Sequence, residues 1–289
     1  MRAVRRRVER LLAPGLHRAP PILIQGETGT GKTFLASLLH RAGPRAQGPF
    51  VAVDCAAIPH DLLESELFGH ERGAFTDAHT AKAGMFQVAS RGTLFLDEIG
   101  ALSGPLQSKL LTALESRSVR RLGATRAEPV DLWVLAATSV NLAAATRAGR
   151  FLEALYHRLA VVTLELPPLR ERGDDILALG ESLLTRVCAD YGLAPRRLSD
   201  DARAALRAHA WPGNVRELGN VMERAALLAE DERITAEPLE LSPREVGDEA
   251  ATIREALQAT GGNVKQAAAR LGLPRSTLRH RLARHGLYS

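Results

Sequence analysis

Three short apolar runs lie in the first half of the chain, and each ends in polar residues or is followed by them. They are PILIQ at 21–25, GTLFL at 92–96 and LWVLAAT at 132–138. Runs of this length predict strands, and the stretch FLASLLH after the first run has apolar residues at helical spacing. Strands that alternate with helices favour a parallel sheet, so the pattern predicts an α/β core.

The pattern changes after the proline pair at 167–168, where we expect an all-helical unit to begin. One helix is predicted to start at 174–176 and another to cover 199–209. Two prolines and a glycine within 237–248 indicate a linker. The expected organisation is a lead-in helix at 1–19, an α/β core at 20–166, a helical unit at 167–236, the linker at 237–248 and a small all-α domain at 249–289.

Three further helices are predicted within 252–285. Thr252 and Glu255 form a capping-box pattern at the start of the first helix. Asn263 precedes the second helix as a possible N-cap residue. Pro274 suits the first turn of the third helix, because its missing N–H has no partner there in any case.

The third of these helices has two different sides. Leu278 and Leu282 are predicted to pack inward, and polar residues near its N-terminal half to face outward, where a recognition helix meets base edges. Residues 249–289 carry seven Lys and Arg against two acidic residues, while the rest of the chain is neutral. This favours nucleic-acid binding; a solvated cationic tail and a helical bundle for protein contacts are the alternatives. The predicted DNA-binding residues are Arg275, Ser276, Thr277, Arg279 and His280.

The composition is that of a globular protein and disfavours several other classes. Of 289 residues, 45% are hydrophobic and 25% charged, which are ordinary values. The two cysteines, Cys55 and Cys188, form neither a disulfide framework nor a metal-ligand spacing. No apolar run approaches the roughly 20 residues of a membrane span, and the basic start lacks the apolar region of a secretory signal. We expect a cytoplasmic protein with no membrane partner.

The segment GETGTGKT lies between the first predicted strand and helix, which is the context that a P-loop requires. Its glycines allow backbone N–H groups to turn toward phosphates, and the helix N-terminus adds a favourable dipole. Lys32 would reach the β- and γ-phosphates, and the Thr33 hydroxyl would ligate Mg²⁺. The alternative is a glycine-rich turn that binds nothing. The predicted ATP-binding residues are Gly26, Glu27, Thr28, Gly29, Thr30, Gly31, Lys32 and Thr33.

Polar residues also end the other two predicted strands. Asp97 would hold Mg²⁺, directly or through water, and Glu98 would orient and deprotonate the attacking water. A helix-capping pair is the alternative for these two residues. Thr138 and Ser139 stand at the carboxyl edge of a parallel sheet, where ligands bind, although an ordinary strand end fits them equally well. Combined with the P-loop, the acidic pair predicts ATP hydrolysis.

Between the two motifs lies the segment LFGHERGAFTDA at 67–78. Its charged run disfavours a buried strand, and its two closely spaced glycines disfavour a helix. The small residues around Phe75 predict a protruding loop with one aromatic side chain at its tip. His70 and His79 bracket the loop and are expected at the surface.

With these elements in place, the chain resembles the bacterial enhancer-binding proteins of the NtrC type, AAA+ ATPases that activate sigma-54 RNA polymerase. The resemblance runs from about residue 21 to the C-terminus and implies a P-loop AAA+ parallel-sheet core, an all-helical lid and a Fis-like helix-turn-helix domain. It implies ATP and Mg²⁺ as cofactors. The motifs that carry it are GETGTGKT, CAAIPHDLLESELFGHERGAFTDA, GTLFLDEIG, LPPLRERGDDI, WPGNVRELGN and GGNVKQAAARLGLPRSTLRHRL.

The resemblance also implies roles for single residues. Thr138 and Ser139 match the sensor I position, and Arg216 in WPGNVREL would be sensor II, touching the bound nucleotide. Arg158 matches an arginine that the family presents to the ATP of the neighbouring subunit. The family works as a ring, usually a hexamer. The loop that reads GAFTGA in the family contacts the sigma factor, and its counterpart here is Gly73, Ala74, Phe75, Thr76, Asp77 and Ala78.

The chain departs from the family pattern at four positions. Asp77 replaces a glycine in the loop, and Leu152 replaces the first of two trans-acting arginines, a residue type worth about 10³–10⁵ in rate in other NTPases. Ser139 replaces an asparagine at sensor I. Asp54, counted among the catalytic residues, replaces an asparagine that holds the catalytic glutamate in the family. Beside Glu98 it would place two carboxylates together, whose repulsion could alter that switch.

Two functions are consistent with the sequence. The first is an activator that binds upstream DNA, assembles from dimers into a ring of identical subunits, and remodels the closed sigma-54 polymerase complex with ATP. The second is a diverged DNA-binding regulator that binds ATP but hydrolyses it poorly. Many relatives begin with a regulatory domain, whereas only a short segment precedes the P-loop here, so we expect none.

Overall fold

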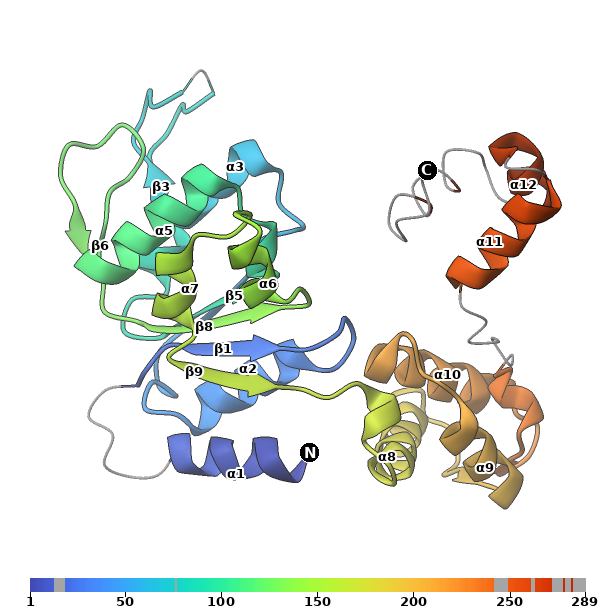
Figure 1. The fold of residues 1–289 in the computed structure, drawn as a ribbon. Helices are drawn as coiled ribbons and strands as arrows, with labels where there is room; N and C mark the ends of the chain where they lie inside the picture. The colour runs from blue at the N-terminus through green and yellow to red at the C-terminus, as the bar shows by residue number, and fades with distance from the viewer. Residues whose placement is uncertain are drawn as a thin grey trace.

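The computed structural model describes residues 1–12, 19–75, 77–241, 249–260, 263–271, 278 and 282 of the 289. An α/β core, a helical lid and part of a small helical domain follow one another along the chain (Figure 1). The predicted fold class is confirmed. The predicted loop residue Thr76 and the five predicted DNA-binding residues lie outside the described residues.

Five parallel strands form the central sheet, in the order β2-β5-β8-β1-β9. The three apolar runs become the three inner strands, as predicted. The outer strands, β2 and β9, lie outside those runs, and their side chains are less buried. The strands are β1 (Ile22–Gln25), β2 (Phe50–Asp54), β5 (Thr93–Asp97), β8 (Trp133–Thr138) and β9 (Val162–Glu165).

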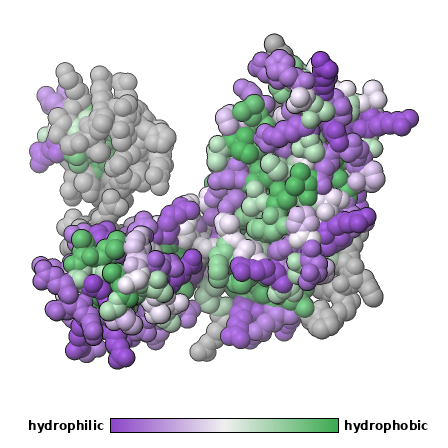
Figure 2. All heavy atoms as spheres, turned by 180° about the vertical axis from the view of Figure 1, so that it is seen from behind, coloured by the Kyte–Doolittle hydropathy of each residue, from purple (hydrophilic) through white to green (hydrophobic). Residues whose placement is uncertain are grey.

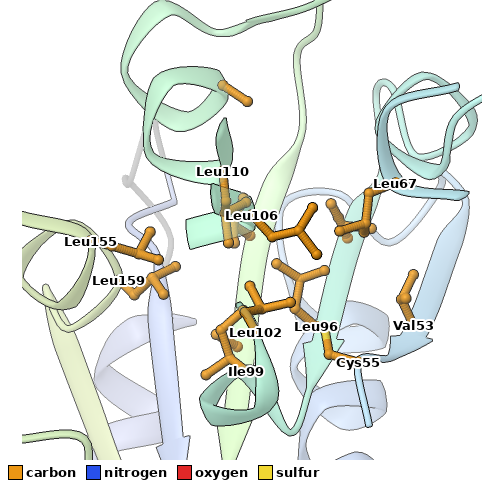
Figure 3. Close-up of a cluster of buried hydrophobic side chains, with 14 of the residues drawn as sticks. Val53, Cys55, Leu67, Leu96, Ile99, Leu102, Leu106, Leu110, Leu155 and Leu159 are labelled. Atoms are coloured by element: carbon orange, nitrogen blue, oxygen red, sulfur yellow. The ribbon is translucent and has the colours of Figure 1, made fainter. Parts of the chain in front are cut away.

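Alternate residues of the inner strands face opposite sides of the sheet, and helices cover both sides. Leu94 and Leu96 belong to the larger apolar cluster, which helices on one side complete (Figure 3). Phe95 faces the other side and packs with residues of α1 and α2. The first side carries α3 (His60–Phe68), α4 (Met85–Val88), η1 (Ile99–Ala101), α5 (Gly104–Ser116), α6 (Leu142–Arg147) and α7 (Glu153–Leu159), and the second carries α1 (Arg2–Leu11) and α2 (Lys32–Ala42).

Two small hairpins project from the first side of the core (Figure 1). The segment between β3 and β4 contains the predicted sigma-contact loop. A backbone bridge between His70 and Leu122 joins the two hairpins. The strands are β3 (Gly69–His70), β4 (Lys82–Ala83), β6 (Ser118–Val119) and β7 (Glu128–Pro129).

The lid has an apolar core of its own. Trp211 is fully buried there, and its indole N–H donates to the Leu206 carbonyl at 2.8 Å. Leu239 is also buried in this core, so lid packing continues past the residue where the linker was expected to begin. The lid elements are η2 (Leu169–Glu171), α8 (Asp175–Asp190), β10 (Arg197–Leu198), α9 (Asp200–Ala208), α10 (Asn214–Leu228), β11 (Arg233–Ile234) and η3 (Glu237–Leu239).

The small C-terminal domain contains α11 (Glu249–Ala259) and α12 (Val264–Arg270). The predicted capping box was wrong, because α11 starts before Thr252 and places that residue inside the helix. The second predicted cap is confirmed: the Asn263 side chain accepts a hydrogen bond from the Gln266 N–H at 3.2 Å. Leu278 and Leu282 are buried against both helices, as their spacing predicted.

Most of the surface of the described residues is polar when seen from behind, with apolar areas over both the core and the lid (Figure 2). In the part of the chain that the structure describes, none of the helices has both the length and the apolar character that a bilayer crossing requires.

The lid core offers a matched pair of substitutions on one helix. Leu218 of α10 is fully buried, whereas Leu227 of the same helix is 48% exposed. We expect Leu218→Ala to lower the free energy of unfolding of the lid by about 2–5 kcal/mol, because it leaves a cavity. Leu227→Ala should stay within about 0.5 kcal/mol. Chemical denaturation followed by tryptophan fluorescence measures both; equal effects would contradict the packing described here.

Candidate nucleotide site and its connections

The carboxyl ends of the parallel strands bring the predicted site residues to one edge of the sheet. The register pairs Asp54 with Asp97 and Gln25 with Thr138. The P-loop leaves β1 at this edge and leads directly into α2. The predicted site residues are far apart in the sequence, and the structure places them at the same edge of the sheet, as expected.

The P-loop backbone has the shape that its glycines permit. Gly29 and Gly31 have φ angles of 81° and 98°, in the left-handed region that side chains disfavour. Lys32, which opens α2, is 6% exposed, and its ammonium donates to the Gly26 carbonyl at 3.0 Å and the Glu27 carbonyl at 3.3 Å. The lysine is thus folded over the loop that would cradle phosphates.

Thr33 and Asp97 supply two oxygen ligands at the mouth of the loop. The Thr33 hydroxyl donates to Asp97 Oδ2 at 3.0 Å. A hydroxyl and a carboxylate are hard donors of the kind that Mg²⁺ prefers, and Mg²⁺ keeps several waters beside one or two carboxylates. This donor pair therefore fits the implied metal.

Glu98 follows Asp97 and is held from two sides. Its Oε1 lies 3.3 Å from the Lys32 ammonium. Its Oε2 accepts hydrogen bonds from the Ser139 backbone N–H at 3.0 Å and the Ser139 hydroxyl at 2.8 Å. The backbone at Glu98 has φ 48°, an uncommon conformation for a residue with a side chain. Glu98 therefore sits on a strained turn with its carboxylate fixed.

Asp54 lies beside Asp97 in the sheet, but its side chain forms hydrogen bonds within its own turn. Its Oδ1 accepts from the backbone N–H groups of Ala56 and Ala57 at 2.9 and 3.2 Å, which caps the turn after β2. Burial, and after it the charges of Asp54, Asp97 and Glu98, raise the pKa of the neighbouring Cys55 thiol to about 12. Cys55 is thus a protonated thiol at neutral pH.

The two other residues predicted as sensors, Thr138 and Arg216, lie in different surroundings. Thr138 is fully buried, and its hydroxyl accepts from the Val140 N–H at 3.1 Å, so it shapes the turn after β8. Arg216 lies near the P-loop because its backbone N–H donates to the Gly29 carbonyl at 3.3 Å. Its side chain is exposed.

The lid docks on the outward side of the P-loop. The Gly29 carbonyl accepts from the Val215 N–H at 2.9 Å, at the start of α10. The Thr28 carbonyl accepts from the Asn214 side chain at 3.0 Å, and the Thr30 carbonyl from the Arg172 guanidinium at 2.8 Å. Three consecutive carbonyls of the loop are therefore satisfied by the lid, not by the core.

An ion pair reinforces this docking. The Arg170 guanidinium donates twice to the Glu27 carboxylate, at 2.6 and 2.9 Å, and the Asn214 amide donates to it at 3.1 Å. The hydrogen bond from Arg170 lowers the pKa of Glu27. Asn214 also accepts from the Leu169 N–H at 2.7 Å, although its own backbone is strained at φ 55°. We call Glu27, Arg170 and Asn214 the lid latch.

The predicted sigma-contact loop turns back on itself. The Gly73 N–H donates to the Ala78 carbonyl at 2.8 Å. Phe75 is 39% exposed, and its ring meets the His70 ring edge-on at a centroid distance of 5.0 Å. Asp77 is exposed. The loop protrudes from the core, as the sequence predicted (Figure 1).

The expectation of a surface position for His70 was wrong. His70 is 9% exposed, because one ring nitrogen bonds to the Ser65 hydroxyl at 2.7 Å and the other donates to the Thr80 carbonyl at 3.0 Å. His79 is exposed, as expected. His70 thus connects α3 to the segment that follows the loop, and its ring packs against Phe75.

Three family models match successive parts of the chain. They are the Sigma-54 interaction domain at residues 1–165, the AAA+ ATPase lid domain at 170–256 and the Bacterial regulatory protein, Fis family, at 247–285. The response regulator protein PilR of Pseudomonas aeruginosa is 43% identical, over 99% of this chain and 68% of its own. The chain belongs to the family of sigma-54-dependent transcription activators.

A second relative and a solved structure are also similar to this chain. The sigma54-dependent transcriptional activator SfnR of Pseudomonas putida is 51% identical over 76% of this chain and 60% of its own. A crystal structure of NtrX from Brucella abortus in complex with ATP has a TM-score of 0.76 and 32% identity, covering 99% of this chain and 68% of that one. The chain thus spans between 60% and 68% of the length of these relatives.

The likeness to the RuvB branch migration motor of Thermotoga maritima is one of fold alone. Its TM-score is 0.58 at 17% identity, over 96% of this chain and 84% of that one. The arrangement of this fold is therefore shared with a protein outside the activator family.

The position at which the resemblance implies a trans-acting arginine is exposed. Leu152 is 38% exposed, and its backbone N–H donates to the buried Gln107 side chain at 2.7 Å. Arg158, the second expected trans-acting arginine, donates to the Leu114 carbonyl of its own chain at 2.9 Å. It borders a cavity of about 740 Å³ at the opposite edge of the sheet, whereas the cavity beside Glu27 and Ser139 has about 250 Å³.

The motifs LPPLRERGDDI and WPGNVRELGN contain Arg170, Arg172 and Asn214, whose roles were not predicted from the sequence. All three contact the P-loop. The polar residues in these two motifs indicated some function. That they contact the P-loop could not be inferred without the fold.

The lid latch can be tested through nucleotide affinity. Arg170→Ala removes both bonds to Glu27, so we expect the Kd for a fluorescent ATP analogue to rise about threefold to tenfold, because the P-loop loses a fixed partner. Arg203→Ala, which breaks the Arg203–Glu181 pair within the lid, is the matched control and should leave the Kd unchanged.

The same test has a defined pH range. The pKa of Glu27 is lowered from its ordinary value of 4.5, so the stabilisation from the latch is fully present above that value. It is lost only as the pH falls through the lowered pKa. The difference between Arg170→Ala and the unmodified chain should therefore be constant around neutral pH, and a difference that vanishes at pH 7 would argue against the latch.

Proposed function

We propose that this protein is an ATP-hydrolysing transcription activator that binds upstream DNA and remodels the closed sigma-54 polymerase complex. The observation that carries the proposal is the joint geometry of Lys32, Thr33, Asp97 and Glu98 at one sheet edge. In one place, these groups would bind phosphate, ligate Mg²⁺ and activate water. Membership of the activator family suggests that the energy of hydrolysis acts on the sigma-54 polymerase complex.

The proposed chemistry is hydrolysis of the γ-phosphoryl group. Lys32 would leave the loop carbonyls and bind the β- and γ-phosphates, while Thr33 and Asp97 would hold Mg²⁺. When bound, Mg²⁺ neutralises phosphate charge. Glu98 would accept a proton from the water whose oxygen attacks the γ-phosphorus, as the bond to the bridging oxygen breaks and ADP leaves. Arg216 of the docked lid would contact the nucleotide.

A short path connects this site to the sigma-contact loop. The turn that Asp54 caps leads into α3, and α3 ends at the hairpin from which the loop projects. His70 binds the loop back to α3 through Ser65. A change at the ends of β2 and β5 would therefore reach Phe75 through one helix, which supports the use of hydrolysis to move the loop.

DNA binding and assembly complete the proposal. The basic segment 249–289 would bind upstream DNA through Arg275, Ser276, Thr277, Arg279 and His280. One such module neutralises few phosphates, so affinity would come from several copies. We propose that dimers assemble into a ring, as a hexamer, in which Arg158 of one subunit faces the ATP of the next.

The decisive experiment uses purified protein, sigma-54 holoenzyme and a promoter with its upstream DNA. ATP-dependent open complexes, detected by permanganate footprinting, are the expected result. Phe75→Ala should keep ATP turnover within about twofold but abolish open complexes, because it removes only the exposed aromatic side chain of the loop. Val88→Ala, an exposed apolar residue elsewhere on the core, is the control. Normal activation by Phe75→Ala would refute the role of the loop.

A second function is favoured by one observation, the exposed Leu152 at the place of a trans-acting arginine. On this alternative the protein binds ATP as an assembly ligand, hydrolyses it poorly and regulates transcription from its DNA site without remodelling sigma-54. Turnover measured against protein concentration separates the two functions, because a steep rise on assembly requires hydrolysis between subunits.

Leu152→Arg tests whether the missing arginine limits turnover. If the assembled ring presents position 152 to a neighbouring ATP, we expect kcat to rise at least tenfold at protein concentrations that support assembly and to stay unchanged in dilute protein. Leu152→Lys supplies charge without the planar guanidinium and should give less. An equal rise at every concentration would contradict action between subunits.

A further inference from the structure

Both carboxylate oxygens of Glu98 are engaged in the structure. Oε2 accepts from the Ser139 N–H at 3.0 Å and the Ser139 hydroxyl at 2.8 Å, while Oε1 lies 3.3 Å from the Lys32 ammonium. A carboxylate oxygen offers two lone-pair sites, so Oε2 has none left. A general base must reach the water that it deprotonates with a free lone pair.

The two contacts respond differently to nucleotide. Lys32 spends its three donors on the Gly26 carbonyl, the Glu27 carbonyl and Glu98. Phosphate charge competes for that ammonium, so nucleotide binding draws Lys32 away and frees Oε1. Nothing in this exchange releases Oε2 from Ser139. The serine contact therefore persists once the site is filled, and it fixes the direction in which Glu98 presents the freed Oε1.

Asp54 cannot take this role. A carboxylate accepts hydrogen bonds and does not donate them, and Oδ1 of Asp54 already accepts from the N–H groups of Ala56 and Ala57. Ser139, on the other side of Glu98, offers two donors directed at one oxygen. The group that restrains Glu98 in this chain is thus at the end of β8, not at the end of β2.

We propose that the Ser139 hydroxyl restrains Glu98 in an unproductive orientation and so limits ATP turnover until the restraint is broken. This rests on the proposed ATPase function. Ser139 acts through Glu98 and is a positioning residue, in contrast to the nucleotide contact that sensor I would make. The left-handed backbone of Glu98, at φ 48°, lets its side chain reach back to Ser139.

The test is Ser139→Ala, assayed for kcat, KM and the Kd of a non-hydrolysable ATP analogue. We expect kcat to rise about threefold to tenfold with KM and Kd unchanged, because one of the two donors to Oε2 is lost while the backbone N–H remains. Ser139→Thr keeps the hydroxyl and should restore the original kcat. Ser108→Ala, on the exposed side of α5, controls for loss of an unrelated serine hydroxyl.

An unchanged or lower kcat in Ser139→Ala would overturn the proposal, and a raised Kd would assign Ser139 to the nucleotide instead. Failure of the proposed function looks different, because then the unmodified chain does not hydrolyse ATP. In that case turnover gained by Ser139→Ala still supports the restraint, and an inactive variant with normal Kd overturns it.

Discussion

The structure depends on how the outward carbonyls of the P-loop are satisfied. A loop that turns its N–H groups toward phosphates directs carbonyls the other way, and buried carbonyls need partners. Here Thr28, Gly29 and Thr30 find them in the lid, through a side-chain amide, the N-terminus of α10 and a guanidinium. The docking also satisfies free N–H groups at the start of α10. The phosphate loop and the lid therefore stabilise each other, and neither has its full set of hydrogen bonds alone.

This dependence explains where strain is tolerated. Trp211 and Asn214 have φ angles of 51° and 55°, and both lie in the turn that leads into α10. Trp211 is fixed by burial in the lid core, and Asn214 by hydrogen bonds to three residues in two other segments. Unfavourable conformations persist only where the surroundings over-determine them. The position of the lid against the nucleotide site is thus set by a rigid turn, so that a change in the loop is transmitted to the lid.

The sequence predicted most of the core and only part of the site. Apolar runs identified the inner strands because burial on both faces requires continuous apolar residues. The P-loop was identified because its spacing of glycines and lysine, between a strand and a helix, seldom occurs for another reason. The bonds of Glu98 were not predictable, since Ser139 lies about forty positions away and only strand order brings it close. His70 was misjudged because its polarity suggested exposure, whereas two hydrogen bonds satisfy its ring in a buried place.

The bridge between His70 and Leu122 has a mechanical consequence. The Glu71 N–H donates to the Leu122 carbonyl, and the Leu122 N–H to the Gly69 carbonyl, both at 2.9 Å. A Cβ added to Gly123 would lie 3.1 Å from that of Ala74, so the two hairpins also touch beyond the bridge. A pulling force on the loop tip is consequently shared among several backbone connections to the core. The pair of hairpins therefore transmits a force on the loop to the core, where a single hairpin would bend.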